Sequence, residues 1–153
     1  MKPKLLVSAC LLGTPCRYDG KSKKNEVVCA LAERFELIPV CPEELGGLPT
    51  PRTPSERRGA RVVRKDGHDV TAEYRRGAAE ALAIAQREGV LAAVLKERSP
   101  SCGSGEIYDG TFTGVLAAGD GVTAELLKAN GIAVFGESEQ SLTELLCSVG
   151  HST

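Results

Sequence analysis

The chain alternates short apolar runs with segments of helical periodicity, and this alternation restricts its fold more than any other feature of the sequence. The apolar runs, which predict strands, lie at residues 5–9, 37–40, 90–95 and 132–135. Apolar side chains recur at helical spacing in residues 25–34, 71–89, 123–130 and 141–149. Because strands that alternate with helices form parallel sheets, we expect an α/β fold: a small doubly wound, mostly parallel sheet with helices on both faces.

Local signals add detail to this fold. Asp66 and Gly67 lie between the short runs 60–63 and 68–70, a pattern that predicts a β-hairpin insertion. Thr71 directly after it is placed to cap the following helix. Residues 41–56 are rich in proline and glycine, which predicts a stiff, non-helical loop.

Length, composition and charge limit the class of protein. The 153 residues suit one domain spanning residues 1–153, and 42% hydrophobic with 25% charged residues is ordinary globular composition. A net charge of -1 makes a long nucleic acid an unexpected partner, because such binders carry a basic face. No apolar run reaches the roughly 20 residues that span a bilayer. The apolar stretch after residues 1–4 is too short for a signal peptide, so we expect a soluble, cytoplasmic protein.

The cysteines are the unusual part of the composition. The chain has six of them, at Cys10, Cys16, Cys29, Cys41, Cys102 and Cys147. The cytosol keeps thiols reduced, so core thiols, metal ligands or catalytic thiols are expected rather than disulfides. Cys29 and Cys147 lie within helical patterns, where packing explains them, and packing is also favoured for Cys41 after an apolar strand.

Residues able to carry chemistry follow three of the expected strands. Cys10 follows the first strand, Cys41 and Glu43 follow the second, and residues 96–102 follow the strand at 90–95. In open parallel sheets, ligands bind outside the carboxyl ends of the strands. The sequence therefore predicts a functional site at this edge of the sheet.

Cys10, Cys16 and Cys102 are the candidate ligands of a metal centre. All three lie in loops that also contain glycine, proline or serine. Thiolates suit zinc, copper(I) or an iron–sulfur cluster, but structural zinc prefers four ligands in closely spaced pairs, which this chain lacks. An iron–sulfur cluster on three cysteines would leave one iron free as a Lewis acid with affinity for sulfur. The residues alone leave ligation and simple core packing both open.

The polar candidates each have a functional and an ordinary explanation. Glu43 could act as a general base for a water molecule, or it could be a solvated loop carboxylate. Arg52 could bind a carbonyl or an anion, although a surface salt bridge is the simpler interpretation. Lys96 could point into the site or extend from a strand end into solvent. Ser99 and Ser101 could orient a substrate or transfer a proton, but serines also form turns.

Four motifs in this order resemble the DUF523 family, whose characterised members are thiouracil desulfidases. The resemblance covers nearly the whole chain. The motifs are Val-Ser-Ala-Cys-Leu-Leu-Gly at 7–13, Cys-Arg-Tyr-Asp-Gly at 16–20, Cys-Pro-Glu at 41–43 with Gly-Gly-Leu-Pro-Thr-Pro-Arg at 46–52, and Leu-Lys at 95–96 with Ser-Pro-Ser-Cys-Gly at 99–103.

The resemblance implies a [4Fe-4S] cluster on Cys10, Cys16 and Cys102. It also implies a non-redox reaction that converts thiouracil to uracil and hydrogen sulfide, with the substrate sulfur on the unique iron. The catalytic acidic residue of the family falls at Glu43. Its catalytic serine falls at Ser99 or Ser101, with Ser99 preferred. The expected partner is a small-molecule thiolated nucleobase.

Three points stay open at the level of sequence. The substrate could be a free base, a nucleoside or a tRNA fragment, and the oligomeric state is not indicated. A sulfur-carrier module, or an iron–sulfur sensor without hydrolytic activity, remains the alternative to an enzyme.

Overall fold

The computed structural model describes residues 2–150, and its centre is a parallel sheet of four strands. In spatial order the strands are β2 (Glu36–Val40), β1 (Lys4–Ser8), β5 (Ala92–Val94) and β8 (Val134–Phe135). Leu6 of β1 pairs with Ile38 on one side and with Ala93 on the other. The predicted parallel sheet is confirmed, and Pro39 lies on an edge strand, where its missing donor costs no ladder bond.

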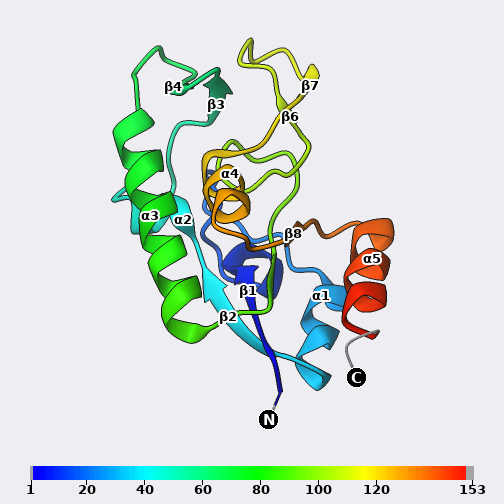
Figure 1. Cartoon of the computed structure of the whole chain (residues 1–153). Coiled ribbons are helices and arrows are strands. Elements are labelled where there is room, and N and C mark those ends of the chain that lie inside the picture. Colours follow the sequence, from blue (N-terminus) through cyan, green and yellow to red (C-terminus); the bar gives the residue numbers. More distant parts are fainter. Residues whose placement is uncertain (1, 151–153) are drawn as a thin grey trace.

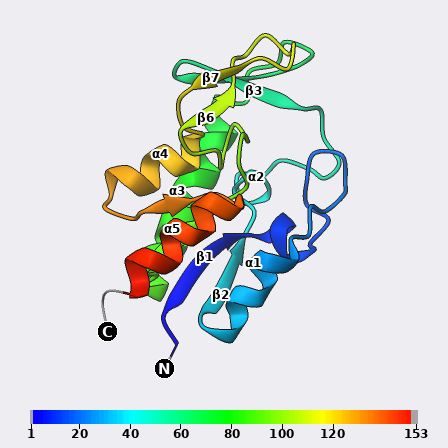
Figure 2. The same ribbon diagram turned by 90° about the vertical axis from the view of Figure 1, so that its right-hand side faces the viewer.

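Helices cover both faces of this sheet, as Figures 1 and 2 show. Helices α1 (Glu26–Ala30) and α5 (Glu139–Gly150) lie on one face, and α3 (Thr71–Glu88) and α4 (Val122–Ala129) lie on the other. Successive side chains of a strand point to opposite faces. Leu5 and Val7 accordingly pack in the core with α1 and α5, whereas Leu6 packs in the core with α3 and α4.

Helix α3 shows how local sequence sets an element. Its buried side chains, at helical spacing, are Tyr74, Ala78, Ala81 and Ala85. The helix ends at Gly89, whose φ of 65° belongs to the left-handed region that favours glycine. The predicted cap at Thr71 is wrong. Val70 is the capping residue, and the Thr71 hydroxyl instead accepts a hydrogen bond from the Val62 N–H at 2.8 Å.

Two antiparallel hairpins lie beyond the carboxyl ends of the sheet strands, at the top of Figure 1. They pair β3 (Ser55–Arg58) with β4 (Arg61–Arg64), and β6 (Glu106–Tyr108) with β7 (Leu116–Ala118). The hairpin predicted around Asp66 and Gly67 is reduced to a single bridge between Val63 and Asp69. β4 pairs mainly with β3. The sequence of β3 has no alternation of apolar and polar residues, so this strand is not predicted from the sequence.

The segment 41–56 also differs from the prediction. It contains the short helix α2 (Pro42–Leu45) in place of a fully non-helical loop. Pro42 stands at the first helical position, where its missing N–H is not needed and its fixed φ suits a helix. This helix carries Glu43. Within residues 2–150 no helix is long and apolar enough to cross a membrane.

Candidate active site at the carboxyl edge of the sheet

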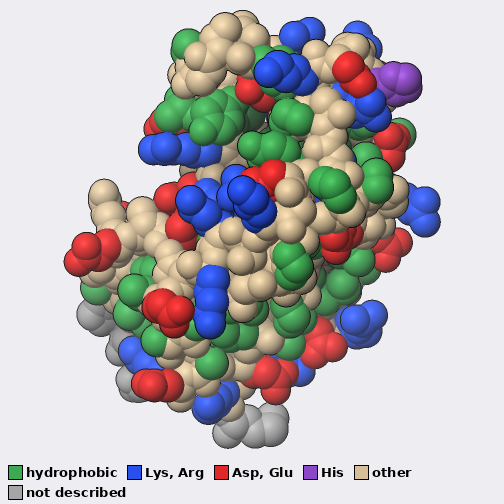
Figure 3. All heavy atoms as spheres, turned by 180° about the vertical axis from the view of Figure 1, so that it is seen from behind, with side chains coloured by type: hydrophobic (Ala, Val, Ile, Leu, Met, Phe, Trp, Pro, Cys, Tyr) green, Lys and Arg blue, Asp and Glu red, His purple; other side chains and the backbone are tan. Residues whose placement is uncertain are grey.

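A cavity of about 580 Å³ opens where β1, β2 and β5 end. Its lining includes residues within two positions of the end of each of these strands, together with residues of both hairpins. β1 has β2 on one side and β5 on the other, so the chain order reverses here. Ligands bind at such switch points in open α/β sheets. In the space-filling view the surface is hollowed below its uppermost part, with Lys and Arg side chains at the edge (Figure 3).

The three predicted cysteine ligands meet in this cavity. Cys10, Cys16 and Cys102 all line it, are free thiols and are buried, with exposed fractions of 8%, 3% and 4%. Cys10 lies in the 3-10 turn Ala9–Leu12 that directly follows β1. Gly13 ends this turn with a φ of 104°, a conformation that glycine adopts without strain. Cys41 is a fourth thiol in the lining, and its Sγ donates to the carbonyl oxygen of Cys16.

The surroundings of three of these thiols raise their pKa values above that of an ordinary cysteine. Burial raises the pKa of Cys102 to about 12. The hydrogen-bonded thiol of Cys10 raises the pKa of Cys16 to about 11. The neighbouring Cys16 and burial raise the pKa of Cys41 as well. A bound metal displaces the thiol proton and holds the sulfur as thiolate.

The donor set fits an iron–sulfur cluster better than a single metal ion. Among residues 2–150, no three His, Cys, Asp or Glu side chains close around one ion position. A cubane cluster attaches each cysteine to a different iron, so its ligands stand farther apart than those of one zinc ion. Cys10, Cys16 and Cys102 are free thiols around one large cavity, with Cys41 as a fourth thiol in the lining, and sulfur is the donor that iron–sulfur chemistry prefers.

Glu43 is held in the same cavity by two side chains. The Tyr74 hydroxyl donates to Glu43 Oε2 at 2.8 Å, and Arg52 Nη2 lies 3.3 Å from the same oxygen. Tyr74 belongs to α3 and is only 2% exposed. Burial and the Glu43 carboxylate raise the pKa of Tyr74, so its hydroxyl stays a donor. Within the described chain, Glu43 Oε1 has no hydrogen-bond or ion-pair partner.

Close backbone contact between α2 and α3 places Glu43 beside Tyr74. A Cβ at Gly77 would lie 1.8 Å from the carbonyl oxygen of Pro42, and a Cβ at Gly46 would lie 2.0 Å from that of Glu73. Neither distance is physically possible for real atoms. Glycine at both positions therefore lets the two helices approach closely enough for the 2.8 Å hydrogen bond to form.

Arg52 joins the Glu43 carboxylate to the cysteine loop in a buried ion pair, instead of forming a surface salt bridge. Its side chain is only 6% exposed. Nη2 donates to the carbonyl oxygen of Cys16 at 3.0 Å, in addition to the contact with Glu43. Nη1 donates to Thr50 Oγ1 at 2.9 Å. Nε is buried and has no hydrogen-bond partner among the described residues.

Of the three remaining candidate residues, two line the cavity and one lies behind its wall. Lys96 lines the cavity, but its Nζ already pairs with Glu137 at 3.1 Å. Ser99 also lines the cavity, and its Oγ accepts hydrogen bonds from the backbone N–H groups of Ser101 and Cys102. Ser101 does not line the cavity. It is fully buried, and its hydroxyl lies 2.8 Å from Thr123 Oγ1.

Comparisons with known proteins give the family of this chain and a solved structure that it resembles. The sequence profile of the 2-thiouracil desulfurase family matches residues 5–139. This chain belongs to the 2-thiouracil desulfurase family. It is 46% identical over 145 residues to the uncharacterized protein YbbK of Bacillus subtilis strain 168, covering 88% of this chain and 96% of YbbK. The solved structure of TudS (DUF523Vcz), a [4Fe-4S]-dependent thiouracil desulfidase, matches with a TM-score of 0.90 at 51% identity, covering 97% of this chain and 99% of TudS.

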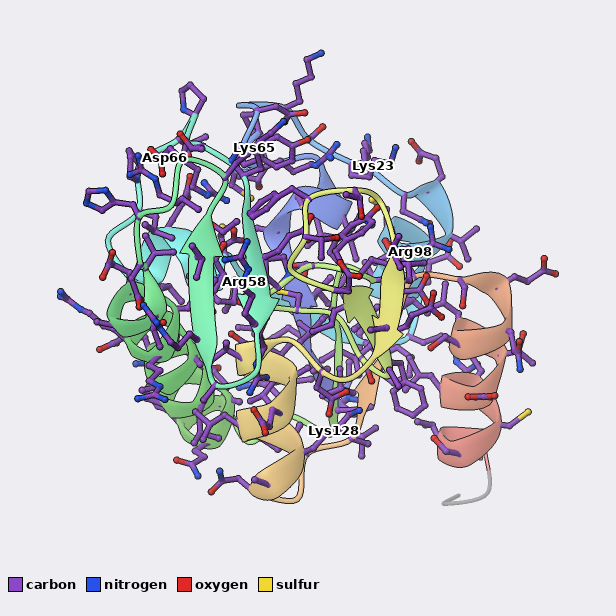
Figure 4. The ribbon with its side chains drawn as sticks, turned by 90° about the horizontal axis from the view of Figure 1, so that it is seen from above. Lys23, Arg58, Lys65, Asp66, Arg98 and Lys128 are labelled. Atoms are coloured by element: carbon purple, nitrogen blue, oxygen red, sulfur yellow. The ribbon has the colours of Figure 1, made fainter. Side chains whose placement is uncertain are left out.

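Several residues that line the cavity cannot be recognised as site residues from the sequence. Tyr74 looks like any core position of an amphipathic helix, and Phe112 lies in a loop without a motif. Three cations without an ion pair within the described chain, Lys23, Lys65 and Arg98, line the cavity from three separate segments (Figure 4). Only the folded chain brings these residues together.

Proposed function

We propose that this protein is a [4Fe-4S]-dependent thiouracil desulfidase that hydrolyses a carbon–sulfur bond without net oxidation or reduction. Thiouracil and water would give uracil and hydrogen sulfide. The observation that carries the proposal is the convergence of three free thiols and the held carboxylate of Glu43 on one cavity at the switch point of the sheet. Membership of the 2-thiouracil desulfurase family supports it.

Cys10, Cys16 and Cys102 would hold the cluster: all three line the cavity as free thiols, and the resemblance to the family places the ligands at these cysteines and not at Cys41. A cluster on three thiolates supplies an open iron, a Lewis acid that prefers soft sulfur and withdraws electrons from the attached carbon. The rest of the chemistry belongs to the side chains around it. A cytoplasmic location suits this site, because thiols stay reduced there.

Glu43 is the group placed to activate water. Its Oε2 is held by Tyr74 and Arg52, which leaves Oε1 to accept a proton from the attacking water. The water oxygen forms the new bond to carbon, the carbon–sulfur bond breaks, and the two water protons end on the departing sulfide. Arg52 also lines the cavity, so its guanidinium is a candidate contact for a carbonyl oxygen of the pyrimidine.

Of the two candidate serines, Ser99 lines the cavity and is placed to contact the substrate or pass on a proton. Ser101 would act only through the loop, because its hydroxyl is engaged with Thr123. Lys96 is a further substrate contact, although its pairing with Glu137 makes it a weaker candidate than Arg52. We propose a small thiolated pyrimidine as substrate, in line with the size of the cavity.

A comparison of two adjacent glutamates tests the proposal. The protein is purified without oxygen, its iron is counted, and release of uracil and sulfide from thiouracil is measured. Glu43→Ala should keep about four irons per chain and lose ~10²–10⁴-fold in rate, as expected for a general base. Glu44→Ala is the matched control, because Glu44 is exposed and bonds Thr50 outside this cavity.

Three results would contradict the proposal. Loss of activity in Glu44→Ala with full activity in Glu43→Ala would mean that the loop positions a different carboxylate. Wild-type protein that holds a cluster but releases neither uracil nor sulfide would instead fit a sensor. Transfer of sulfur to an acceptor without uracil-dependent sulfide release would fit a sulfur carrier.

A further inference from the structure

Two residues of the cavity lining have an unusual backbone conformation. Among residues 2–150, Arg98 and Phe112 are the only non-glycine residues with positive φ, at 68° and 59°. Both line the cavity described above. A positive φ is uncommon for a bulky side chain and persists only where the surrounding structure enforces it. Such conformations concentrate at sites that hold ligands.

A buried carboxylate enforces the conformation of Phe112. Glu56 of β3 is only 8% exposed, and its Oε1 accepts hydrogen bonds from the N–H of Phe112 at 3.1 Å and of Gly110 at 2.9 Å. A Cβ at Gly110 would approach Cγ of Arg58 to 2.5 Å, so the β6–β7 loop lies tightly on the first hairpin. The two hairpins lie side by side when the molecule is seen from above (Figure 4).

The core does not account for the Phe112 ring. Phe112 belongs to none of the three hydrophobic clusters, and its side chain is half-buried in the cavity lining. The other aromatic residues of the lining are Tyr18, Tyr74 and Tyr108. Tyr74 packs in the core and bonds Glu43, and Tyr18 is exposed. Phe112, with Tyr108 of β6 near it in the chain, therefore offers a ligand an aromatic surface on the side of the cavity formed by the β6–β7 hairpin.

We propose that Phe112 is a stacking surface for the pyrimidine ring of the substrate, fixed in place by Glu56. The inference rests on the proposed desulfidase function and adds a specificity-determining residue to it. A thiolated pyrimidine is planar and has a π-face, which stacks on an aromatic ring. Glu56 contributes by ordering the loop, so that the ring is already in position before the substrate arrives.

Steady-state kinetics of the cluster-loaded enzyme with 2-thiouracil test this role. Phe112→Leu keeps an apolar side chain of similar bulk but removes the π-face, and Phe112→Tyr keeps the ring. We expect KM to rise about tenfold or more in Phe112→Leu, with kcat changed less than about threefold, and near wild-type KM in Phe112→Tyr. Glu56→Gln should raise KM by a smaller factor, because a neutral amide oxygen accepts the same bonds more weakly.

Val115→Ala is the matched control, since Val115 lies on the same loop, is exposed and does not line the cavity. Iron content and melting temperature of each variant separate a local effect from loss of fold. If the wild-type protein desulfurates thiouracil and Phe112→Leu has the same KM as the wild type, the stacking role is overturned. A KM increase in Val115→Ala equal to that in Phe112→Leu would overturn it too. Wild-type protein without any desulfuration would instead refute the proposed function itself.

Discussion

Removal of the Tyr74 hydroxyl is the sharpest perturbation that the site offers. Tyr74→Phe deletes the 2.8 Å hydrogen bond to Glu43 Oε2 and leaves the aromatic ring packed with Val62 and Val70. The cysteines do not touch this hydroxyl, so we expect the cluster content and the fold to be retained. What changes is the orientation of the Glu43 carboxylate, which then relies on Arg52 alone at 3.3 Å.

The size of the effect follows from the bond that is lost. A hydrogen bond to a charged group contributes about 1.5–3 kcal/mol. Each 1.36 kcal/mol or so of barrier corresponds to a factor of ten in rate. If the bond serves only to orient the base, kcat should fall by about 10- to 150-fold. KM should change little, because the hydroxyl bonds Glu43 rather than substrate.

The assay is a double-mutant cycle on kcat for thiouracil desulfuration, with iron content measured for every variant. Tyr74→Phe should be slow in the wild-type background and have no further effect in Glu43→Gln, where the base is already absent. Tyr18→Phe is the control, because Tyr18 lines the same cavity and its hydroxyl forms no hydrogen bond to Glu43. Wild-type kcat in Tyr74→Phe, or losses that multiply in the double variant, would refute the positioning argument.

Two further predictions concern the cluster and the fold. Cys10→Ala, Cys16→Ala and Cys102→Ala should each lose the cluster, whereas Cys29→Ala and Cys147→Ala, outside the cavity, should retain about four irons per chain in an iron and sulfide assay. Gly77→Ala should lower the melting temperature, because its Cβ would lie 1.8 Å from the Pro42 carbonyl oxygen. Overpacking costs about 1–3 kcal/mol or more, and a melting temperature at or above the wild-type value would contradict the close contact of α2 and α3.

The sequence predicts the sheet and its helices well because each of these elements is encoded locally. Apolar runs mark the buried strands, and periodic apolar positions followed by Gly89 mark α3 and its end. The hairpin β3–β4 is different. The buried side chain of β3 is Glu56, and the groups that satisfy it, the N–H of Gly110 and Phe112, are more than fifty residues away in sequence. No local pattern shows such a partner.

For the candidate site, the sequence predicts which residues lie at the same edge of the sheet but not the contacts between them. Parallel topology brings strand ends together, so the sequence alone is enough to expect Cys10, Glu43 and Cys102 at one edge of the sheet. The contacts between them are not predictable in this way. Tyr74 occupies an ordinary core position of α3, and its partner Glu43 lies 31 residues earlier in the chain. Helix α2, which presents Glu43, is too short for periodicity to reveal.

Arg52 shows how the two parts of the site depend on each other. The same Nη2 atom donates to the Cys16 carbonyl and contacts Glu43 Oε2, and the Arg52 backbone N–H donates to the Tyr18 carbonyl. A movement of the loop that carries Cys16 would therefore shift the guanidinium and, with it, the carboxylate. A lysine has a single nitrogen and cannot span these acceptors as a planar guanidinium does. Arg52 is thus placed to keep the Glu43 carboxylate at a constant distance from the cysteine loop.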